Sequence, residues 1–377
     1  MKQAGTIKIF LDAHIFDGEF QGSRTFVMEL YMILLQKKEL EFYIAAYDVE
    51  NLKKYFPQAE NIFFIKFKYR SSIFRLLFDI PGIIKKYGIQ YAHFQYIVPP
   101  LKNCKFIVTT HDVLFNEYPR EFSLWYRLNK NFLYKRSAKK ADILTTVSLY
   151  SKSSIEKYLG ISPAKVNVIK HGVSIKYFEG YDKQAAKELI KNKYGIEKYI
   201  LFVSRLEPRK NHTMVLQAYL DLKLFEQNYC LVFLGHESIK TPAFHDMLNA
   251  LPPTIRAFIF FNDKTDDEEL MTFYRAASVF VYPSKAEGFG LPPLEAGALK
   301  IPVLCSNTTS LSDFTFFGRT HINPWDYTAF RNTLSDVLVN VPNDNCLDAI
   351  AKTIQQNYCW QNTAAQFYQL LQKNNTP

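Results

Sequence analysis

The chain of 377 residues is longer than one hydrophobic core usually supports, so two domains of about 150–200 residues each are expected. No apolar run approaches the roughly 20 residues of a membrane-spanning helix, and Asp12 comes too early for a signal peptide, which predicts a cytoplasmic globular protein. The five cysteines show no CxxC spacing, which argues against a zinc site or a disulfide framework.

The net charge of +10 lies entirely in the first half of the chain. Residues 1–172 carry 26 basic and 15 acidic side chains, whereas the remainder carries 20 and 21. Within the first half, residues 66–87 and 124–140 interleave basic and aromatic side chains, which suits an anionic surface such as a membrane leaflet or a nucleic acid. A solvated helix face explains either segment alone equally well. The two segments together favour a membrane surface.

In chain order, the first half alternates between apolar strand patterns and helical segments. Ile7 to Leu11 indicates a buried strand, and residues 24–38 have apolar side chains at helical spacing. The loop between them contains GEFQGSR (18–24), which is not the GxGxxG fingerprint, although Gly22 lets its backbone approach a ligand. Further strands are expected at residues 42–47, 62–66, 91–94, 106–110 and 143–147, and residues 166–169 close the first half. This alternation predicts a parallel sheet with ligands at the carboxyl ends of its strands.

His111 and Asp112 directly follow the strand expected at residues 106–110. They form a titratable pair at a carboxyl end, where a parallel sheet binds its ligands. A histidine in such a place is more often a hydrogen-bonded structural residue, because its pKa lies near neutrality without any catalytic purpose. The adjacent carboxylate and the position at a strand end keep a catalytic role open.

The basic excess stops near Gly172, which we take as the domain boundary, and a second α/β pattern then begins. Its strands are expected at residues 199–203, 230–234, 257–261, 278–282 and 303–305. The loop after the first of these strands carries Arg205 and Lys210, two fixed cations of the kind that a diphosphate needs. Taken alone, they are better explained as ordinary loop charges.

Two further features are interpreted as structural. The four acidic residues 266–269 resemble a metal-binding cluster, but they fit better as first-turn acids of a helix with Thr265 as its cap. Residues 357–372 indicate an amphipathic helix in which Trp360 packs against the core.

Residues 282–307 indicate a strand, a tight loop and a helix. Gly288 and Gly290 allow positive φ and a close approach by a ligand, and the prolines that follow suit a first helical turn. The free amides at the positive end of that helix would stabilise an anion, above all a phosphate. Glu287 and Glu295 bracket this anion site. Hydrogen bonds to sugar hydroxyls are the obvious reason for carboxylates in such a place.

Together these pieces resemble the family 4 retaining glycosyltransferases. SRLEPRKN (204–211) and EGFGLPPLEA (287–296), at this separation, are the specific motifs. The other matching pieces extend the resemblance over essentially the whole chain: GEFQGSR (18–24), THD (110–112), TVS (146–148), HGV (171–173), DEEL (267–270), YRAA (274–277) and Trp360. HGV replaces the NGV that is frequent in the family, a departure that affects the domain junction more than the chemistry. The closest likeness is to mannosyltransferases that build bacterial surface polysaccharides such as the O-antigen of lipopolysaccharide.

The resemblance implies an α/β protein of the GT-B architecture, with two Rossmann-like domains that face each other across a cleft. Residues 1–172 would be the acceptor- and membrane-facing domain, and residues 173–354 the nucleotide-sugar donor domain. A last helix, about 355–377, would pack back on the first domain.

The resemblance also assigns roles to single residues. Arg205, Lys210 and the loop at Gly22 would bind the donor diphosphate. Glu295 would bind the ribose, and Glu287 the hydroxyls of the transferred sugar. His111 would lie at the reacting centre, and backbone amides would meet the phosphate or sugar at Phe289, Gly290 and Leu291.

The implied reaction transfers a hexose from a nucleotide diphosphate sugar to an acceptor hydroxyl, with retention at the anomeric carbon and without a metal or other cofactor. GDP-mannose is the best guess for the donor. The acceptor would be a lipid-linked saccharide at the inner face of the cytoplasmic membrane, which the protein would contact through residues 66–87 and 124–140. A nucleic-acid partner is not expected.

Other functions remain open. The same fold serves nucleotide-sugar epimerases, which need a set of acid–base carboxylates that we cannot identify here, and phosphorylases, which are much longer chains with pyridoxal phosphate. A basic protein that binds a membrane or nucleic acid and carries a degenerate sugar site is the alternative of a different class.

Overall fold

The computed structural model describes residues 6–18 and 22–375, and its internal contacts divide the chain into two units. Unit 1 comprises Met1–Gly172 and Trp360–Pro377, and unit 2 comprises Val173–Cys359. The sequence placed the corresponding boundaries at residue 172 and about residue 355. Within the described ranges, no helix is long and apolar enough to cross a bilayer.

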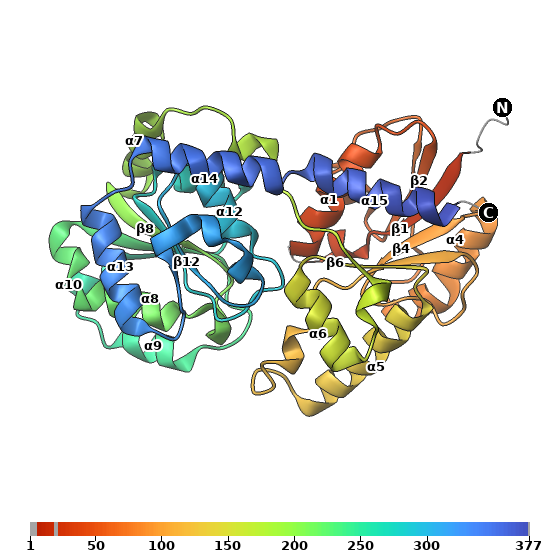
Figure 1. Cartoon of the computed structure of the whole chain (residues 1–377), viewed down its shortest axis with the longest axis horizontal. Helices are drawn as coiled ribbons and strands as arrows, with labels where there is room; N and C mark the ends of the chain where they lie inside the picture. Colours follow the sequence, from red (N-terminus) through yellow and green to blue (C-terminus); the bar gives the residue numbers. More distant parts are fainter. Residues whose placement is uncertain (1–5, 19–21, 376–377) are drawn as a thin grey trace. The chain divides into compact units, whose positions relative to one another are not determined.

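Unit 1 is built, in the part that the structure describes, on a seven-stranded parallel sheet with the order β3-β2-β1-β4-β5-β6-β7 (Figure 1). Its strands are β1 (Ile7–Asp12), β2 (Leu40–Ala46), β3 (Ile62–Lys66), β4 (Tyr91–Gln95), β5 (Lys105–Thr109), β6 (Ile143–Thr146) and β7 (Val166–Val168). The first six lie within two residues of a strand expected from the sequence, so the predicted parallel α/β architecture is confirmed; β7 was not predicted.

Alternate side chains of the central strand β1 enter two different cores. Ile9 and Leu11 belong to the core that includes α1 and α15, whereas Phe10 belongs to the core under α4, α5 and α6. A strand covered on both faces is mostly apolar, which explains the run IKIFL, whose one charged residue, Lys8, is only partly buried. The helices of unit 1 are α1 (Gly22–Leu34), α2 (Val49–Lys53), α3 (Ser72–Phe74), α4 (Ile80–Tyr87), α5 (Leu124–Lys140), α6 (Leu149–Leu159) and α15 (Trp360–Asn375).

Unit 2 repeats the design with a six-stranded parallel sheet of order β10-β9-β8-β11-β12-β13. Its strands are β8 (Lys198–Val203), β9 (Tyr229–Leu234), β10 (Ile259–Asn262), β11 (Val279–Tyr282), β12 (Val303–Ser306) and β13 (His321–Ile322). Its helices are α7 (Lys183–Tyr194), α8 (His212–Asp221), α9 (Pro242–Asn249), α10 (Pro253–Arg256), α11 (Asp267–Ala276), α12 (Leu291–Ala298), α13 (Tyr327–Val339) and α14 (Asp344–Asn357). The sequence did not predict β13, because two residues are too few to show a period.

The acidic run at residues 266–269 begins helix α11, as the sequence predicted. The predicted cap, Thr265, is wrong: the side chain of Asp266 accepts the amide of Glu269 at 2.8 Å and caps the helix. Aspartate satisfies an amide of the first turn and also complements the helix dipole, which threonine does not. Among the described residues, no group of three or more His, Cys, Asp or Glu side chains could hold a metal ion.

The last helix, α15, packs on unit 1. Trp360 is 3% exposed, and its ring centroid lies 6.0 Å from that of Phe26 on α1 and 5.8 Å from that of His171. The predicted return of the C-terminal helix to the first domain is therefore confirmed. Its start lies three residues later than expected, because α14 ends at Asn357 and a short break separates the two helices.

Replacing Trp360 tests this packing. We expect Trp360→Ala to lower the free energy of unfolding of unit 1 by about 3–5 kcal/mol, because a large buried ring is removed from the core. Urea denaturation followed by circular dichroism measures the change. Trp325→Ala is the matched control, since that ring is 59% exposed on unit 2. Equal losses in the two variants would contradict the packing of α15.

Candidate active site

Most of the predicted site residues of unit 2 lie in two loops, which follow the neighbouring strands β8 and β11. Strand β8 pairs in parallel with β11, and it is at this pair that the strand order changes direction. Such a switch point in an open parallel sheet is where ligands bind, outside the carboxyl ends of the strands. The loop after β8 carries Arg205 to Lys210, and the loop after β11 carries Glu287.

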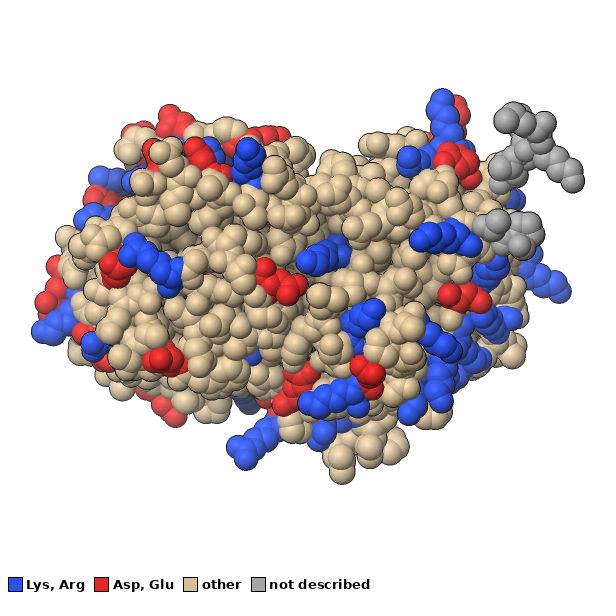
Figure 2. All heavy atoms as spheres, viewed as in Figure 1, with Lys and Arg blue, Asp and Glu red and all other residues tan. Residues whose placement is uncertain are grey.

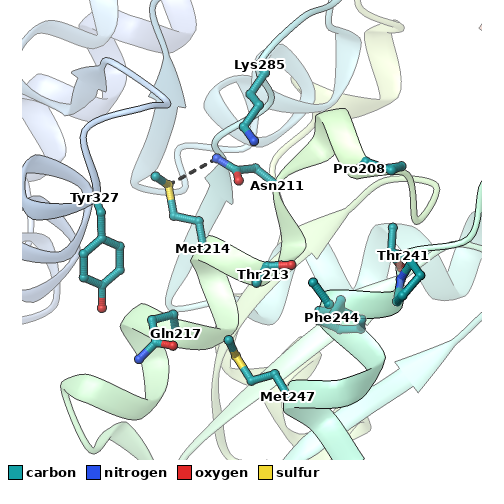
Figure 3. Close-up of a pocket in the computed structure, with 12 residues that line it drawn as sticks. Pro208, Asn211, Thr213, Met214, Gln217, Thr241, Phe244, Met247, Lys285 and Tyr327 are labelled. Carbon is teal, nitrogen blue, oxygen red and sulfur yellow. Dashed lines mark hydrogen bonds between the residues drawn. The ribbon is translucent and has the colours of Figure 1, made fainter. Parts of the chain in front are cut away.

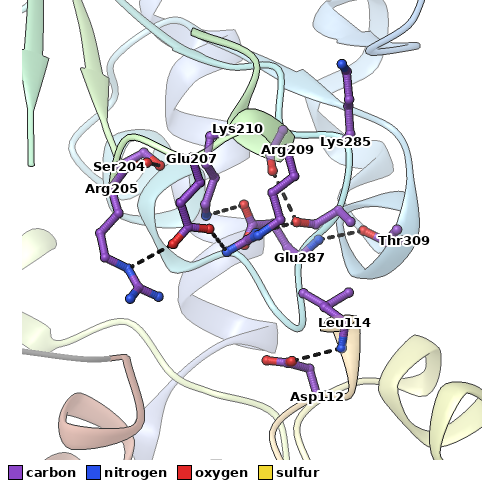
Figure 4. A network of polar contacts seen from close by, with 12 residues as sticks. Asp112, Leu114, Ser204, Arg205, Glu207, Arg209, Lys210, Lys285, Glu287 and Thr309 are labelled. Atoms are coloured by element: carbon purple, nitrogen blue, oxygen red, sulfur yellow. Dashed lines mark hydrogen bonds and ion pairs between the residues drawn. The ribbon is translucent and has the colours of Figure 1, made fainter. Parts of the chain in front are cut away.

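An ion-pair cluster joins these loops (Figure 4). The Nζ atom of Lys210 lies 2.5 Å from Oε1 of Glu287 and 3.0 Å from the hydroxyl of Tyr282. Arg209 places Nη1 at 3.3 Å from Oε2 of Glu287 and Nη2 at 2.6 Å from Oε2 of Glu207. Glu287 is thus held by a cation at each of its two carboxylate oxygens.

Burial and charge act against each other in this cluster. Burial raises the pKa of Glu287, but the neighbouring Lys210 and Arg209 outweigh it and lower the pKa to about 2. Burial lowers the pKa of Lys210 to about 8, although Glu287 opposes the shift. Both groups are therefore charged at pH 7.

The cluster has an excess of positive charge. Three cations, Arg205, Arg209 and Lys210, meet two carboxylates, Glu207 and Glu287. Arg205 is exposed, and its Nε lies 3.5 Å from Oε1 of Glu207. The sequence predicted Arg205 and Lys210 as two fixed cations for a diphosphate. The structure pairs both with carboxylates and adds Arg209 and Glu207, which the alternating charges of RLEPRK could have indicated.

The loop from Glu287 leads directly into helix α12. Gly290 has φ +97°, and a Cβ atom there would lie 2.3 Å from Cδ2 of Leu311, so only glycine fits. The hydroxyl of Ser310 donates to the carbonyls of Glu287 and Phe289, at 2.8 and 2.9 Å. Helix α12 begins at Leu291, so the predicted amides at 289–291 lie at its positive end.

Glu295 lies one turn into α12 and is partly buried. The hydroxyl of Tyr274 donates to its Oε2 at 3.0 Å. Burial raises the pKa of Glu295 to about 7, although Tyr274 and Lys176 lower it. Two carboxylates that are eight positions apart in one motif therefore differ widely in acidity, because only Glu287 has two cations at contact distance.

His111 lies in unit 1 at the carboxyl end of β5. Its Nε2 is 2.7 Å from Oε1 of Gln95, and burial lowers its pKa to about 3, so the ring is neutral at pH 7. Asp112, which suggested a titratable pair, accepts the amide of Leu114 at 3.2 Å. Sequence analysis did not identify Gln95 as the hydrogen-bond partner of His111. Gly22 is the first residue of α1, and residues 19–21 of the predicted glycine loop lie outside the described residues.

A cavity of about 510 Å³ lies near this cluster in unit 2 (Figure 3). It is lined mainly by residues of α8 and α9, including Met214, Phe244 and Met247, and Lys285 borders it. Arg205, Lys210 and Glu287 do not line it. The cavity is therefore distinct from the site that the sequence predicted.

Comparison with known proteins gives a consistent result. A family model described as "Glycosyl transferases group 1" matches residues 183–340, and one described as "Glycosyltransferase Family 4" matches residues 22–177. O-antigen chain mannosyltransferase B of Escherichia coli is 30% identical over 230 residues, which are 60% of this chain and 59% of that protein. O-antigen chain mannosyltransferase RfbU of Salmonella typhimurium is 27% identical over 246 residues, 64% and 63% of the two chains.

The aligned part spans less than two thirds of these curated relatives. Sucrose-phosphate synthase from Thermosynechococcus elongatus superimposes with a TM-score of 0.78 over 98% of both chains at 18% identity, which is a likeness of fold. The two parallel α/β units have the GT-B fold, and the two family models identify the chain as a glycosyltransferase. The chain belongs to the family 4 glycosyltransferases and is related to the mannosyltransferases of surface-polysaccharide synthesis.

The raised pKa of Glu295 makes stability depend on pH. Because the pKa of Glu295 in the folded state, about 7, exceeds the ordinary value of 4.5, protonation of this carboxyl stabilises the native state over the unfolded state. This stabilisation is complete below pH 4.5 and is lost as the pH rises through 7. We expect the difference in free energy of unfolding between Glu295→Gln and the wild type to rise by about 2 kcal/mol, in favour of the variant, as the pH rises from 5 to 8. Urea denaturation at each pH measures this. Glu188→Gln, at an exposed carboxylate, should show no such trend.

Proposed function

We propose that the chain is a retaining hexosyltransferase that moves a sugar, mannose as the best guess, from a nucleotide diphosphate sugar to a hydroxyl of a lipid-linked saccharide. The observation that carries this proposal is the cluster of Lys210, Arg209 and Glu287 at the start of α12. Preorganised cations and helix amides stabilise a departing diphosphate. The choice of mannose is supported by relatives that are named mannosyltransferases.

The leaving group is a nucleoside diphosphate, whose negative charge grows in the transition state. Arg205 and Lys210 would hold this diphosphate, together with the amides at 289–291. The cluster supplies one positive charge in excess of its carboxylates before any ligand is bound. A transfer that needs no metal follows from this charge stabilisation.

Glu287 is better suited to bind hydroxyls than to attack the sugar. Each of its carboxylate oxygens already accepts a hydrogen bond from a cation, Oε1 from Lys210 at 2.5 Å and Oε2 from Arg209 at 3.3 Å. These bonds lower the nucleophilicity of the carboxylate. Its remaining lone pairs can still accept hydrogen bonds from hydroxyl groups. Retention would then proceed by departure and attack on the same face of the sugar, with a leaving phosphate oxygen that helps to take the acceptor proton. Glu295 would bind the ribose.

Removing either partner of the ion pair tests this function. We expect Lys210→Met and Glu287→Gln each to lower turnover of GDP-mannose by about 10²–10³-fold, because each removes a group that acts on the diphosphate or the sugar. Turnover is measured as release of GDP with saturating acceptor. Lys285→Met is the matched control, since Lys285 lies in the same loop as Glu287 but borders the other cavity. Near-normal turnover in either site variant would reject the assigned role.

The acceptor is proposed to be lipid-linked because unit 1 carries an apolar and basic surface, which we call the aromatic face. It consists of the exposed residues Tyr69, Ile73, Phe74, Leu77, Phe78, Leu124, Trp125, Tyr126, Leu128 and Phe132. Exposed basic side chains accompany them, among them Lys66, Lys85, Lys86, Lys135 and Lys139. Figure 2 shows Lys and Arg gathered on the part of unit 1 that carries α5.

The two segments of the aromatic face belong to one side of the unit 1 sheet. Residues 72–79 lead directly into α4, and α4 and α5 both pack into the core that contains Phe10, so the two exposed segments lie on the same side of the sheet. Aromatic side chains that enter the interface between lipid and water, with lysines beside anionic headgroups, form a typical peripheral membrane contact. We therefore propose that the protein works at the cytoplasmic face of a membrane.

The membrane contact predicts a defect for a variant of this face. We expect the double variant Phe74→Ser with Trp125→Ser to bind vesicles that contain phosphatidylglycerol at least about tenfold more weakly, because two inserted rings are lost. Cosedimentation measures the binding. Leu189→Ser with Val341→Ser is the control, as both side chains are about equally exposed on unit 2. Unchanged binding of the first variant would reject this face as the contact.

A further inference from the structure

Unit 1 contains a chain of hydrogen-bonded polar side chains on the sheet face that packs against α1 and α15. The hydroxyl of Tyr31 on α1 lies 2.9 Å from Nδ1 of His93, and Nε2 of His93 lies 2.8 Å from Oγ1 of Thr109. Thr109 and Thr145 share a hydrogen bond of 2.7 Å. All four side chains are fully buried. The chain crosses three neighbouring strands, β4, β5 and β6.

Gln95 connects this chain to the candidate active site. Gln95 and His93 are two positions apart on β4 and so project from the same face of the sheet. Nε2 of Gln95 lies 3.3 Å from Nε2 of His93, and Oε1 of Gln95 lies 2.7 Å from Nε2 of His111. The amide of Gln95 is 5% exposed and bridges the two imidazoles.

The presence of polar side chains at these buried strand positions has to be explained. An apolar side chain would fill a buried strand position without the cost of removing an amide or imidazole from water. A fully bonded polar network, in contrast, fixes the orientation of each of its members. The member that reaches the carboxyl edge of the sheet, where ligands bind, is His111.

We propose that Gln95 is a positioning residue that holds His111 in the tautomer with its proton on Nε2, so that Nδ1 accepts a hydrogen bond from a hydroxyl of the transferred sugar. An amide oxygen can only accept, so the 2.7 Å contact requires the donor to be Nε2–H of His111. A neutral imidazole then has one lone pair, on Nδ1. The part of this inference that concerns the sugar rests on the proposed function.

The surroundings of His111 keep it neutral. Its ring lies 5.7 Å from the ring of His171 and 5.5 Å from that of Tyr96, and His93 lies beyond Gln95. Burial lowers the pKa of His171 and His93 and raises the pKa of Tyr96, so none of these carries a charge at pH 7. Asp112, the next residue in the chain, is the nearest carboxylate in sequence. His111 therefore acts as a hydrogen-bond acceptor and not as a general acid.

The tautomer can be measured without any substrate. In the full chain labelled with ¹⁵N at histidine, the His111 signals are assigned by their loss in His111→Gln. We expect a protonated Nε2 and an unprotonated Nδ1, with no titration between pH 6 and 8. A proton on Nδ1, or titration of the ring in this range, would overturn the proposal whatever reaction the protein catalyses.

Two replacements of Gln95 separate positioning from packing. Gln95→Leu keeps the size but removes the acceptor, and we expect kcat for GDP-mannose to fall by about 10²-fold with little change in KM. Gln95→Glu keeps an acceptor and raises the pKa of His111 by its charge. It should therefore recover activity at high pH and lose it as pH falls through the raised pKa.

The outcomes distinguish this inference from the proposed function. Equal losses in Gln95→Leu and Gln95→Glu at every pH would show that Gln95 only packs, and would reject positioning. Full activity of His111→Ala would reject a sugar contact by His111 and with it the purpose assigned to Gln95. Absence of wild-type turnover with GDP-mannose would instead count against the proposed donor, while the tautomer measured in the free protein would stand.

Discussion

The buried ion pair between Glu287 and Lys210 is the interaction on which the arrangement of unit 2 depends. Removing two charges from water costs several kcal/mol per ion, and the pair recovers this only when its geometry and its other hydrogen bonds are good. Tyr282 bonds Lys210, and Arg209 bonds Glu287 and Glu207, which meets that condition. The bonds can form because β8 and β11 are neighbours, so the sheet topology determines the geometry of the site.

The two units hold their site residues by different physical means. In unit 2 the site residues are charged and are held by ion pairs with one another. Fixed charges of this kind would stabilise the departing diphosphate of the proposed reaction. In unit 1 His111 is neutral and is held through Gln95 by a chain of neutral hydrogen bonds. Charge would add little there, because a sugar hydroxyl needs an acceptor in a fixed direction. In both units the arrangement depends on adjacent parallel strands, β8 and β11 in unit 2 and β4 and β5 in unit 1, which bring the site residues together.

Much of the fold and part of the site could be predicted from the sequence. Strands buried on both faces form apolar runs that periodicity detects, and motifs with glycine, proline and charge identified Lys210, Glu287 and Glu295. The pairing of Lys210 with Glu287 could not be predicted, because 77 positions separate them and no local pattern encodes that contact. Gln95 was missed for the same reason: its partner His111 lies on another strand, and a single buried glutamine leaves no periodic signal.

Exposure is the other property that the sequence did not reveal. The basic and aromatic letters of α5 suggested a charged surface, yet they do not show which rings face solvent. In the structure the residues that α5 buries, Tyr134, Ser137 and Ala138, all lie in its second half. The first half, from Leu124 to Leu128, therefore presents its apolar side chains to solvent. Such exposure is unfavourable in water, and it is explained if that half of the helix has a nonaqueous partner, which a bilayer supplies beside the lysines that bind its headgroups.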